Sequence, residues 1–541
     1  MATFSRPGVF IQEVELPQTI ELAESGNAIG AFVGALAKGP TNVPVLLSSW
    51  TQFVKTFGNL EDAYPTTWAA YNFFSNGGRQ LYVKRVTGSG AAQASVTLTD
   101  ASQAQLNTIL VQASNAGSWG NQLAVQIRPA GTSTRFGLAV YGTPTVAGNP
   151  TSNLLEQFTD LSMSSTDPRY FESVINASSS FIAVANLNSA SVAPTNMPVV
   201  GTTLYALGST TAGADGSAPT RTIYSTALTS FDPIQNPLVM NIPAAAYVYT
   251  TSGTNTDRTL ALNIMADLVA YCEGRGDSFA VLDTPAGLTA AEAQTWADDL
   301  TAAFSASSNG GCAAVYYPWV LIPNTLRATP GATRLQAPGA AVVGQYLATD
   351  ASRGVFKTPA GLGNQIALAV ATDHQFTNAE LDSLNTSANP VNAIRQVPGA
   401  GIVIMGGRTL DNTPGHRYIN VRRSLNYIEK ELKDLTAFAV FENNDSRLWN
   451  RLRVVVNTFL GSYWQQGGLR GASTAEAFYV KCDTTTTSEA DILNGRVNIE
   501  VGVALEYPAE FVVIKVGQIT GKDRKSTRLN SSHTDISRMP S

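Results

Sequence analysis

Apolar residues predict a strand near each end of the chain. Near the start, P-G-V-F-I-Q-E-V at positions 7–14 is compatible with a strand, and a loose polar stretch follows it. The first run that is apolar enough to be buried on both faces comes later, at residues 28–34. Near the end, Val497 to Leu505 show strict alternation of apolar and other residues, the period of a half-buried strand.

An extended arm outside a globular body exposes unpaired backbone donors and acceptors, which tend to recruit another chain. The two terminal strands therefore indicate assembly rather than catalysis. The residues of these two strands that we expect to meet another chain are Val9, Phe10, Ile11, Val14, Val497, Ile499, Val501 and Val503.

Between these ends the pattern changes along the chain. Short apolar runs separated by turn-forming residues predict a β-rich insert at 96–225, in which the nearly uncharged stretch 189–220 is expected to be an exposed excursion or linker. From about residue 241, predicted helices alternate with buried strands, which favours a parallel or mixed sheet layered by helices. In chain order, these predicted elements are 259–272, 279–283, 290–305 and 313–320.

The region after residue 401 has the clearest helical pattern. Apolar residues step by four and three from Val421 to Leu435, as they do on one face of an amphipathic helix. A second stripe of the same kind runs from Leu448 to Tyr463. We therefore expect two amphipathic helices here.

Cations occupy an unfavourable place on the second helix. Arg447, Arg451 and Arg453 lie in its first two turns, where the helix dipole disfavours a positive charge by up to ~1 kcal/mol each. Two explanations stay open. The arginines pair with Glu442 or Asp445 just upstream, or they meet an acidic surface of a partner.

Composition limits the classes of function. With 541 residues, the chain is long enough for about three or four domains. Charged residues make up only 14%, which suits a surface covered by neighbours, and a net charge of -5 gives no reason to expect direct nucleic-acid binding. No signal peptide is indicated, and no apolar run is long enough to span a bilayer. We expect a soluble protein made in a cytoplasm, without direct membrane insertion.

The sequence contains little that indicates catalysis. The three cysteines are far apart and lack C-x-x-C spacing, and the three histidines have no metal-ligand spacing, so neither a metal site nor a cofactor is expected. His374 follows Asp373 but has no G-x-S-x-G nucleophile elbow to serve, which disfavours a hydrolase. Arg275-Gly276-Asp277 spells an integrin-binding tripeptide and is the only hint of an adhesin or capsid subunit; we interpret it as a turn. The protein is not expected to be an enzyme.

A series of motifs in fixed order resembles the sheath protein of contractile phage tails, from Pro7 to about Gln518. The motifs are P-G-V-F-I-Q-E-V at 7–14, A-F-V-G-A-L-A-K-G-P-T-N-V-P-V at 31–45, F-F-S-N-G-G-R-Q-L-Y-V-K-R-V at 73–86, S-W-G-N-Q-L at 118–123, Y-Y-P-W-V at 316–320, A-T-D-A-S-R-G-V-F-K-T-P-A-G at 348–361, G-G-R-T-L at 406–410, Y-I-N-V-R-R-S at 418–424 and P-A-E-F at 508–511.

The resemblance implies a mechanical role. Sheath proteins polymerise as stacked six-fold rings around a tail tube, and they contract when the baseplate triggers, which drives the tube through the host envelope for viral genome ejection. Their terminal arms exchange strands with the C-terminal domains of adjacent subunits, a pattern that this chain matches at 7–16 and 496–516. The tube contact of the family lies on a helix of the C-terminal domain, for which Arg447, Arg451 and Arg453 are the candidates here.

The expected fold is a multidomain α/β and α+β protein with a subtilisin-like α/β core, a β-sandwich insert, a C-terminal α+β domain and extended strand-exchanging arms. The expected parts are an N-terminal arm at 1–25, the first part of the core at 26–95, an outward-facing β-rich insert at 96–225, a subtilisin-like domain at 226–395, a C-terminal sheath domain with a terminal arm strand at 396–521, and a tail at 522–541. The tail turns basic and polar and departs from the family, so it is either non-native or disordered.

The implied partners are further copies of the chain in six-fold rings, the tail tube protein, the baseplate and the tail terminator. The expected location is the tail of a virion, as a late protein assembled in the cytoplasm of a bacterial host. A phage-tail-like bacteriocin or an extracellular contractile injection system is the alternative, because its sheath would have the same sequence features.

Overall fold

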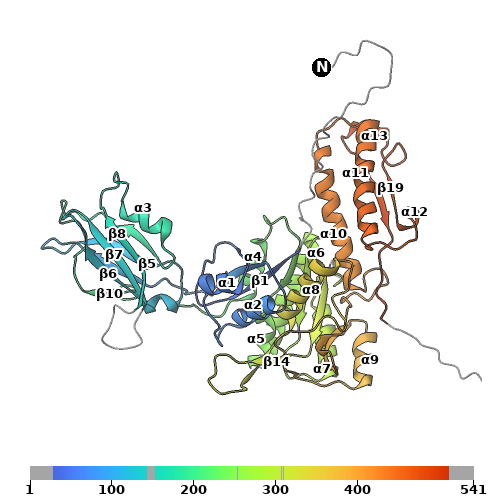
Figure 1. The fold of residues 1–541 in the computed structure, drawn as a ribbon, viewed down its shortest axis with the longest axis horizontal. Helices are drawn as coiled ribbons and strands as arrows, with labels where there is room; N and C mark the ends of the chain where they lie inside the picture. Colours follow the sequence, from blue (N-terminus) through green and yellow to red (C-terminus); the bar gives the residue numbers. More distant parts are fainter. Residues whose placement is uncertain (1–27, 143–152, 253, 306–307, 309, 511–541) are drawn as a thin grey trace, which may run out of the picture. The chain divides into compact units, whose positions relative to one another are not determined.

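The computed structural model describes residues 28–142, 153–252, 254–305, 308 and 310–510, and it is built around a mixed eight-stranded sheet (Figure 1). The strands are, in spatial order, β18 (Gly401–Ile404), β17 (Val391–Val397), β13 (Ala313–Tyr317), β12 (Phe279–Asp283), β11 (Leu238–Asn241), β1 (Ile29–Ala35), β3 (Leu81–Val86) and β2 (Val45–Leu47). The six inner strands run parallel, and β18 and β2 pair antiparallel at the two edges.

Helices cover both faces of this sheet, each over its own buried core. One core joins the sheet to α4 (Arg221–Thr229), α5 (Ala244–Ser252), α6 (Asn255–Arg275), α7 (Ala290–Ala302) and α9 (Asn378–Thr386). The other joins it to α1 (Trp50–Phe57), α2 (Pro65–Ser75) and α8 (Gly339–Arg353).

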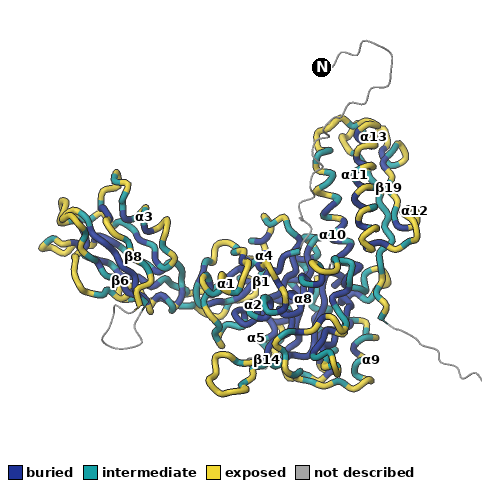
Figure 2. The backbone as a smooth tube through the Cα atoms, viewed as in Figure 1, coloured by how far each residue is buried: buried dark blue, intermediate teal, exposed yellow. Residues whose placement is uncertain are grey.

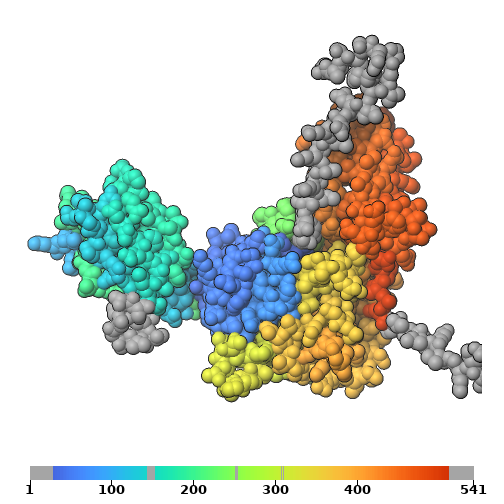
Figure 3. All heavy atoms as spheres, viewed as in Figure 1, coloured from blue at the N-terminus to red at the C-terminus, as the bar shows by residue number. Residues whose placement is uncertain are grey.

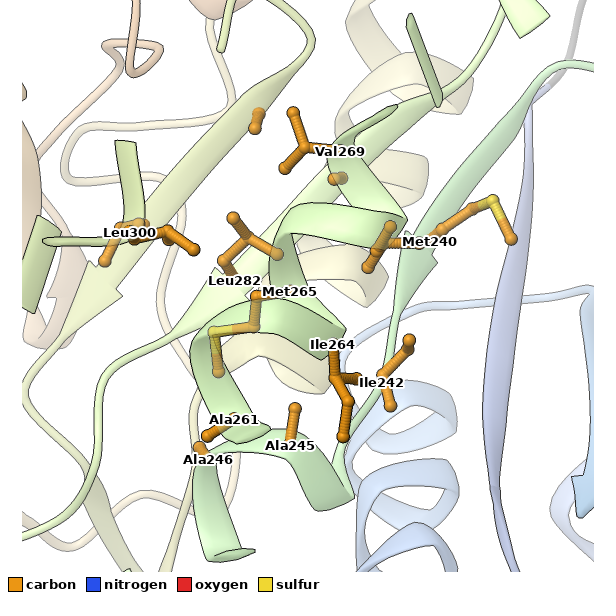
Figure 4. Close-up of a cluster of buried hydrophobic side chains, with 14 of the residues drawn as sticks. Met240, Ile242, Ala245, Ala246, Ala261, Ile264, Met265, Val269, Leu282 and Leu300 are labelled. Atoms are coloured by element: carbon orange, nitrogen blue, oxygen red, sulfur yellow. The ribbon is translucent and has the colours of Figure 1, made fainter. Parts of the chain in front are cut away.

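Strand β1 shows how one sequence serves both cores. Ala31 and Val33 belong to the first core, whereas Phe32 between them belongs to the second, as the alternation of side chains along a strand requires. Figure 2 shows the resulting continuous buried interior of the sheet, and Figure 4 shows Met265 and Val269 of α6 among the apolar side chains of the first core. A run buried on both faces, as residues 28–34 predict, is therefore confirmed.

Most of the predicted α/β elements are confirmed, with shifted ends. Strand β12 has the predicted bounds, whereas α6 extends beyond 259–272 because Thr254 caps its start and Gly276, with φ of 79°, ends it. The apolar run 313–320 forms two strands instead of one. Pro318 lacks the backbone N–H that a continuous ladder needs, so β13 ends at Tyr317 and the chain then enters a second sheet. That sheet consists of β15 (Thr333–Gln336), β14 (Val320–Pro323) and β16 (Ala371–Thr372).

Residues 95–207 form two antiparallel sheets around a common hydrophobic core. The first sheet contains β4 (Ser95–Thr99), β5 (Asn107–Ala113) and β9 (Ile182–Asn186), and the second contains β10 (Leu204–Ala206), β6 (Leu123–Pro129), β7 (Phe136–Gly142) and β8 (Leu154–Leu161). The connections include η1 (Ser118–Gln122) and α3 (Phe171–Ser178).

Most residues of the stretch 189–220 are exposed, as expected, but the stretch is part of the two-sheet fold and is not a linker. Within this stretch, β10 pairs with β6, and Met197 and Leu207 are buried in the core of the two sheets. The Ser189 hydroxyl also donates a hydrogen bond to Asp100. The stretch is therefore held by a few buried apolar anchors and one short strand, while its small polar residues lie mostly at the surface.

The body and the two-sheet region are joined through a buried arginine on β3. The Arg85 guanidinium donates hydrogen bonds to the carbonyl oxygens of Leu36 (2.7 Å), Gly39 (2.8 Å) and Ala116 (2.8 Å). Burial lowers the pKa of Arg85 to about 10. The guanidinium therefore stays charged at neutral pH, and it satisfies carbonyls from two separate segments.

Candidate assembly interface

The region after residue 418 forms a helical pair packed on a small sheet. Helices α10 (Ile419–Thr436) and α11 (Ser446–Gln465) are linked by η3 (Ala437–Ala439) and lie side by side (Figure 1). Ile428 of α10 and Val456, Leu460 and Tyr463 of α11 share one buried cluster. Both predicted amphipathic helices are therefore confirmed.

Two short strands cover this helical pair. Strand β19 (Phe478–Lys481), which follows α12 (Thr474–Ala477), pairs antiparallel with β20 (Glu500–Val503), placing Val480 opposite Val501 and Phe478 opposite Val503. Val501 and Val503 pack against the cluster of α10 and α11. In the space-filling view, this strand region and α11 form one continuous surface (Figure 3).

The strand predicted from Val497 to Leu505 is only partly formed. Val497 and Ile499 are not part of β20 but pack against a second apolar cluster, which contains Leu448 and Trp449. The backbone N–H of Asn498 donates to the Thr487 hydroxyl (3.1 Å) next to α13 (Glu489–Leu493). The Thr487 hydroxyl thus binds the N–H group that a strand partner would otherwise bind, so the hydrogen-bonded pairing of β19 and β20 begins only at Glu500.

The outer edges of β19 and β20 have no strand partner among the described residues. The sheet contains these two strands alone, and a two-stranded sheet is marginal in isolation. Its inner face is covered by helices, and the polar side chains of Tyr479 and Glu500 join on the outer face through a 2.8 Å hydrogen bond. Within the described part of the chain, neither outer edge of this sheet pairs with a further strand.

The structure settles how the start of α11 accommodates its three arginines. The carboxylate of Asp445 caps the helix by accepting hydrogen bonds from the backbone N–H groups of Arg447 (2.9 Å) and Leu448 (3.0 Å). Among the described residues, no ion pair within 4.0 Å forms between an acidic side chain and Arg447, Arg451 or Arg453. Of the two explanations, pairing with Glu442 or Asp445 is not observed among the described residues, since the Asp445 carboxylate binds the backbone instead. Contact with an acidic partner surface stays a prediction.

The arginines project differently from the helix. Arg447 and Arg451 are exposed and Arg453 is half-buried. The Arg451 guanidinium lies over the Phe438 ring, 4.2 Å from its centroid, and Arg453 donates to Asn450 at 2.6 Å. Arg447 is exposed at the start of α11 and has no acidic side chain within 4.0 Å in the described part of the chain.

An exposed apolar turn beside these arginines was not foreseen from the sequence. Val440 and Phe441, between α10 and α11, are 67% and 105% exposed, and Phe441 adopts a φ of 68°. A bulky residue in the left-handed region is strained and rare. The pattern of apolar positions could not reveal this feature, since it treats an exposed phenylalanine like a buried one.

A buried ion pair fastens the helical pair to the body. The Arg423 guanidinium on α10 makes a bidentate contact with the Asp350 carboxylate at the end of α8, with one N···O distance of 2.9 Å, and lies over the Tyr346 ring. Burial alone lowers the pKa of Arg423, but the Asp350 carboxylate outweighs burial and raises it. The Arg423 guanidinium therefore stays charged in the folded protein.

A second buried polar cluster lies at the carboxyl ends of β11 and β12. Asp283 accepts hydrogen bonds from the Gly339 N–H (2.6 Å), at the start of α8, and from the Asn241 side chain (3.1 Å). Burial raises the pKa of Asp283 to about 6. No space remains for a ligand, since a Cβ atom on Gly339 would come within 2.5 Å of the carboxylate.

The residues weighed for catalysis and adhesion have structural partners. His374 lies 3.2 Å from Glu380 and His416 lies 2.9 Å from Asp411. Arg275 is bound to Asp277 at 2.7 Å, and their side chains are only 11% and 15% exposed, so this tripeptide is a closed turn. The described residues contain no group of three or more metal-ligating side chains.

The three cysteines are all interior side chains. Cys272, Cys312 and Cys482 are free and buried, and burial raises the pKa of each thiol. In the part of the chain that is described, no helix has the length and apolarity needed to cross a bilayer. The N-terminal candidates Val9, Phe10, Ile11 and Val14 lie outside the described residues.

The region that contains the candidate interface matches a known protein family. Residues 411–519 match the family model of the phage tail sheath C-terminal domain, which covers α10, α11, β19 and β20. The chain has no match among curated protein sequences.

Solved structures share the fold over nearly the whole chain. The contracted helical sheath of the anti-feeding prophage is 20% identical with a TM-score of 0.56, and the match covers 96% of this chain and 100% of that one. The contracted sheath complex of the extracellular contractile injection system PVC is 20% identical with a TM-score of 0.52 and the same coverage. A sheath tail protein from Listeria innocua is 12% identical with a TM-score of 0.58, covering 88% of this chain and 95% of that one. The mixed α/β fold with several sheets is thus the fold of sheath proteins.

Proposed function

Since the chain belongs to the contractile tail sheath family, we propose that it is a structural subunit that polymerises around a tail tube and contracts. Contraction would drive the tube through the envelope of a target cell, and in a phage it would serve genome ejection. The observation that carries the proposal is the sheath C-terminal domain at 411–519, whose small sheet has two open edges in the described residues. In this role the chain acts through its surfaces and needs neither a cofactor nor a catalytic residue.

We place the expected domains on the observed elements as follows. The two antiparallel sheets of residues 95–207 correspond to the β-sandwich insert, and the helix-covered parallel sheet corresponds to the subtilisin-like domain. The predicted boundary between residues 225 and 226 falls inside α4, which packs into the core of the parallel sheet. The subtilisin likeness concerns fold and carries no implication of proteolysis.

The proposed partners are neighbouring copies in six-fold rings, the tube protein, the baseplate and the tail terminator. Structures that share the fold are described as a helical sheath and as a baseplate with six-fold symmetry, which supports self-assembly of this kind. If contraction releases a few kcal/mol of free energy per subunit, the sum over the polymer would suffice to move the tube a long way. The extended state would be held behind a kinetic barrier until contraction is triggered.

Strand exchange at the small sheet would connect the subunits. An added strand would supply the backbone partners that the outer edges of β19 and β20 lack. Val9, Phe10, Ile11 and Val14 would form the incoming strand from a neighbour. Val501 and Val503 already pair with β19 of their own chain. In the exchange, β20 would therefore receive a strand from a neighbouring subunit and would not be donated to it.

Deletion of residues 1–16 tests strand exchange. We expect the truncated chain to fold as a monomer with an unchanged thermal unfolding midpoint, because the deleted residues would pair only with another subunit. We also expect it to form no sheath around added tubes in negative-stain electron microscopy. Striated contractile cylinders from the truncated chain would contradict the proposal.

The arginines at the start of α11 are our candidates for the tube contact. Arg447 and Arg451 are exposed beside the apolar residue Phe441, which combines charge with apolar surface at one end of the helical pair. Replacement of Arg447, Arg451 and Arg453 by glutamate should leave the helix folded, because acidic residues favour a helix start. The triple variant should lose co-sedimentation with an acidic tube, whereas unchanged binding would exclude this surface.

An extracellular contractile injection system or a phage-tail-like bacteriocin is the second candidate. The fold is shared with the anti-feeding prophage and PVC sheaths over 96% of the chain, which supports keeping this alternative beside the phage tail. For a phage, the expected location is the virion tail, with assembly in the bacterial cytoplasm. Particles purified from the source that carry DNA-filled capsids would establish the phage function, and headless particles would establish the alternative.

A further inference from the structure

One buried charge lacks a partner in the described part of the chain. The buried charged side chains that have hydrogen-bond partners there are Lys84, Arg85, Asp100, Asp283, Arg408, Asp411 and Arg423. Glu431 of α10 is the exception. It is 5% exposed, and its carboxylate has no hydrogen bond and no ion pair within 4.0 Å with any described residue. Because glutamate is almost never buried without a partner, this side chain requires an explanation.

Glu431 lines a cavity of about 470 Å³ between the body and the helical pair. Arg423 and Tyr427 line it from the same face of α10, at intervals of four residues. Side chains on a helix lean toward its N-terminus, so Glu431 leans toward Tyr427 along the cavity wall. The Glu431 oxygens are not among the fully enclosed polar atoms without a partner in the described part of the chain, so they reach open space.

The other charges of the lining do not compensate Glu431. Asp277 pairs with Arg275 at 2.7 Å, and Asp350 pairs with Arg423. Arg79, the remaining cation of the lining, is exposed and makes no ion pair with Glu431 within 4.0 Å. One buried negative charge of the cavity is thus left without a counter-charge.

Aromatic rings form the wall beside this charge. The Tyr427 ring lies 6.1 Å from that of Phe459 and 5.6 Å from that of Tyr463, and Phe356 lies 5.8 Å from Tyr463. All four line the cavity. Ring faces attract cations, and a carboxylate forms strong hydrogen bonds with ammonium and guanidinium groups. The volume falls in the range of small-molecule pockets, roughly 300–1,000 Å³.

We propose that this cavity binds an organic cation whose ammonium or guanidinium group pairs with Glu431 and whose carbon chain contacts the rings. Burial raises the pKa of Glu431, and a bound cation would counter that effect. Such a cation has two sources, a free ligand or a basic side chain of a second copy of the chain. The inference goes beyond the proposed function, because polymerisation and contraction do not by themselves require a cation site.

Calorimetric titration of the full-length, unassembled chain with n-butylammonium tests the proposal. 1-Butanol is the uncharged control with the same carbon chain, and we expect the wild-type chain to bind butylammonium but not butanol. The Glu431→Gln variant keeps the size of the side chain and should bind butylammonium about tenfold more weakly or less, because a hydrogen bond between charged groups is lost. It should unfold at the wild-type temperature or above, since an unpaired buried charge is removed. The Glu429→Gln variant, at an exposed position of the same helix, should bind like the wild type.

A second titration separates the two sources of the cation, and this arm rests on the proposed function. Assembled chains that no longer bind butylammonium would assign the cation to a basic side chain of a neighbouring copy. Unchanged binding after assembly would assign it to a free ligand.

Three results would overturn the proposal. They are no binding of butylammonium by the wild-type chain, equal binding of butylammonium and butanol, and equal binding of butylammonium by the wild type and Glu431→Gln. None of them would bear on the sheath function, because these titrations use unassembled chains.

Discussion

At the scale of single residues, the buried charges of this chain differ in how they are compensated. The Arg423 guanidinium has a carboxylate partner in Asp350, whereas Asp283 has only two neutral donors, from Gly339 and Asn241. Burial therefore raises the pKa of Asp283 to about 6. Burial therefore favours the protonated form of Asp283 over its charged form.

This difference predicts a pH effect on stability. Because the folded state holds the Asp283 proton more tightly than the unfolded state, the stabilising contribution is complete below about pH 4 and is lost as pH rises through about 6. The Asp283→Asn variant should lack this fall. Urea unfolding midpoints of wild type and variant, measured between pH 4 and 7, give the comparison.

The exposed Asp382 provides a matched control. The Asp382→Asn variant should keep the pH dependence of the wild-type protein. If Asp283→Asn also keeps it, Asp283 is not the group responsible.

Residue-level features were the hardest to predict from the sequence. The polar stretch that contains Arg423 gave no sign that Asp350, 73 positions away, would be its partner. The sequence shows that the arginines of α11 are unfavourable at a helix start, but neither ion pairing nor an acidic partner, the two explanations it left open, includes the cap by Asp445. A carboxylate just before a helix can bind either an arginine side chain or the first backbone N–H groups, and the local sequence does not distinguish these two cases.

At the scale of elements, long periodic patterns predicted the structure well. The stripes of α10 and α11 each extend over four or more turns, so tertiary packing had no reason to override them. The short segments behaved differently. The Thr487 hydroxyl contacts the backbone at Asn498 and shortens β20. In 189–220 the buried residues Met197 and Leu207 are too widely spaced to form a recognisable pattern, so the stretch resembled a linker.

The cap of α11 yields a prediction at this scale. Replacing Asp445 by alanine removes the acceptor of two backbone N–H groups and leaves three arginines at an uncapped helix start. We expect the free energy of unfolding to fall by about 1 kcal/mol, within 0.5–2 kcal/mol. Chemical unfolding by urea gives this value. The neighbouring Ser446→Ala variant is the control and should change stability far less; equal effects would mean that the cap is not important.

At the scale of the whole molecule, the sequence motifs predicted the family and the mixed α/β fold. They could not show whether the C-terminal segment pairs within its own chain or with a neighbour, because alternation along a strand is the same in both cases. In the structure, Val501 and Val503 pair internally with β19. Exchange between subunits remains a prediction for the outer edges of this sheet.

The final segment gives a prediction at this scale. Residues 522–541 are basic and polar and have no apolar period, so we expect them to add nothing to the stability of the protein. Deleting them should leave the thermal unfolding midpoint and the formation of sheaths unchanged. A loss of assembly on deletion would show that the segment belongs to the C-terminal arm.

The bidentate contact between Arg423 and Asp350 bears on how force would pass through a subunit. Rotation of α10 against α8 would separate two opposite charges away from water, at a cost of several kcal/mol. Under mechanical load, the helical pair and the parallel sheet should therefore move as one rigid lever. Flexing during a power stroke should concentrate in the connections between neighbouring subunits.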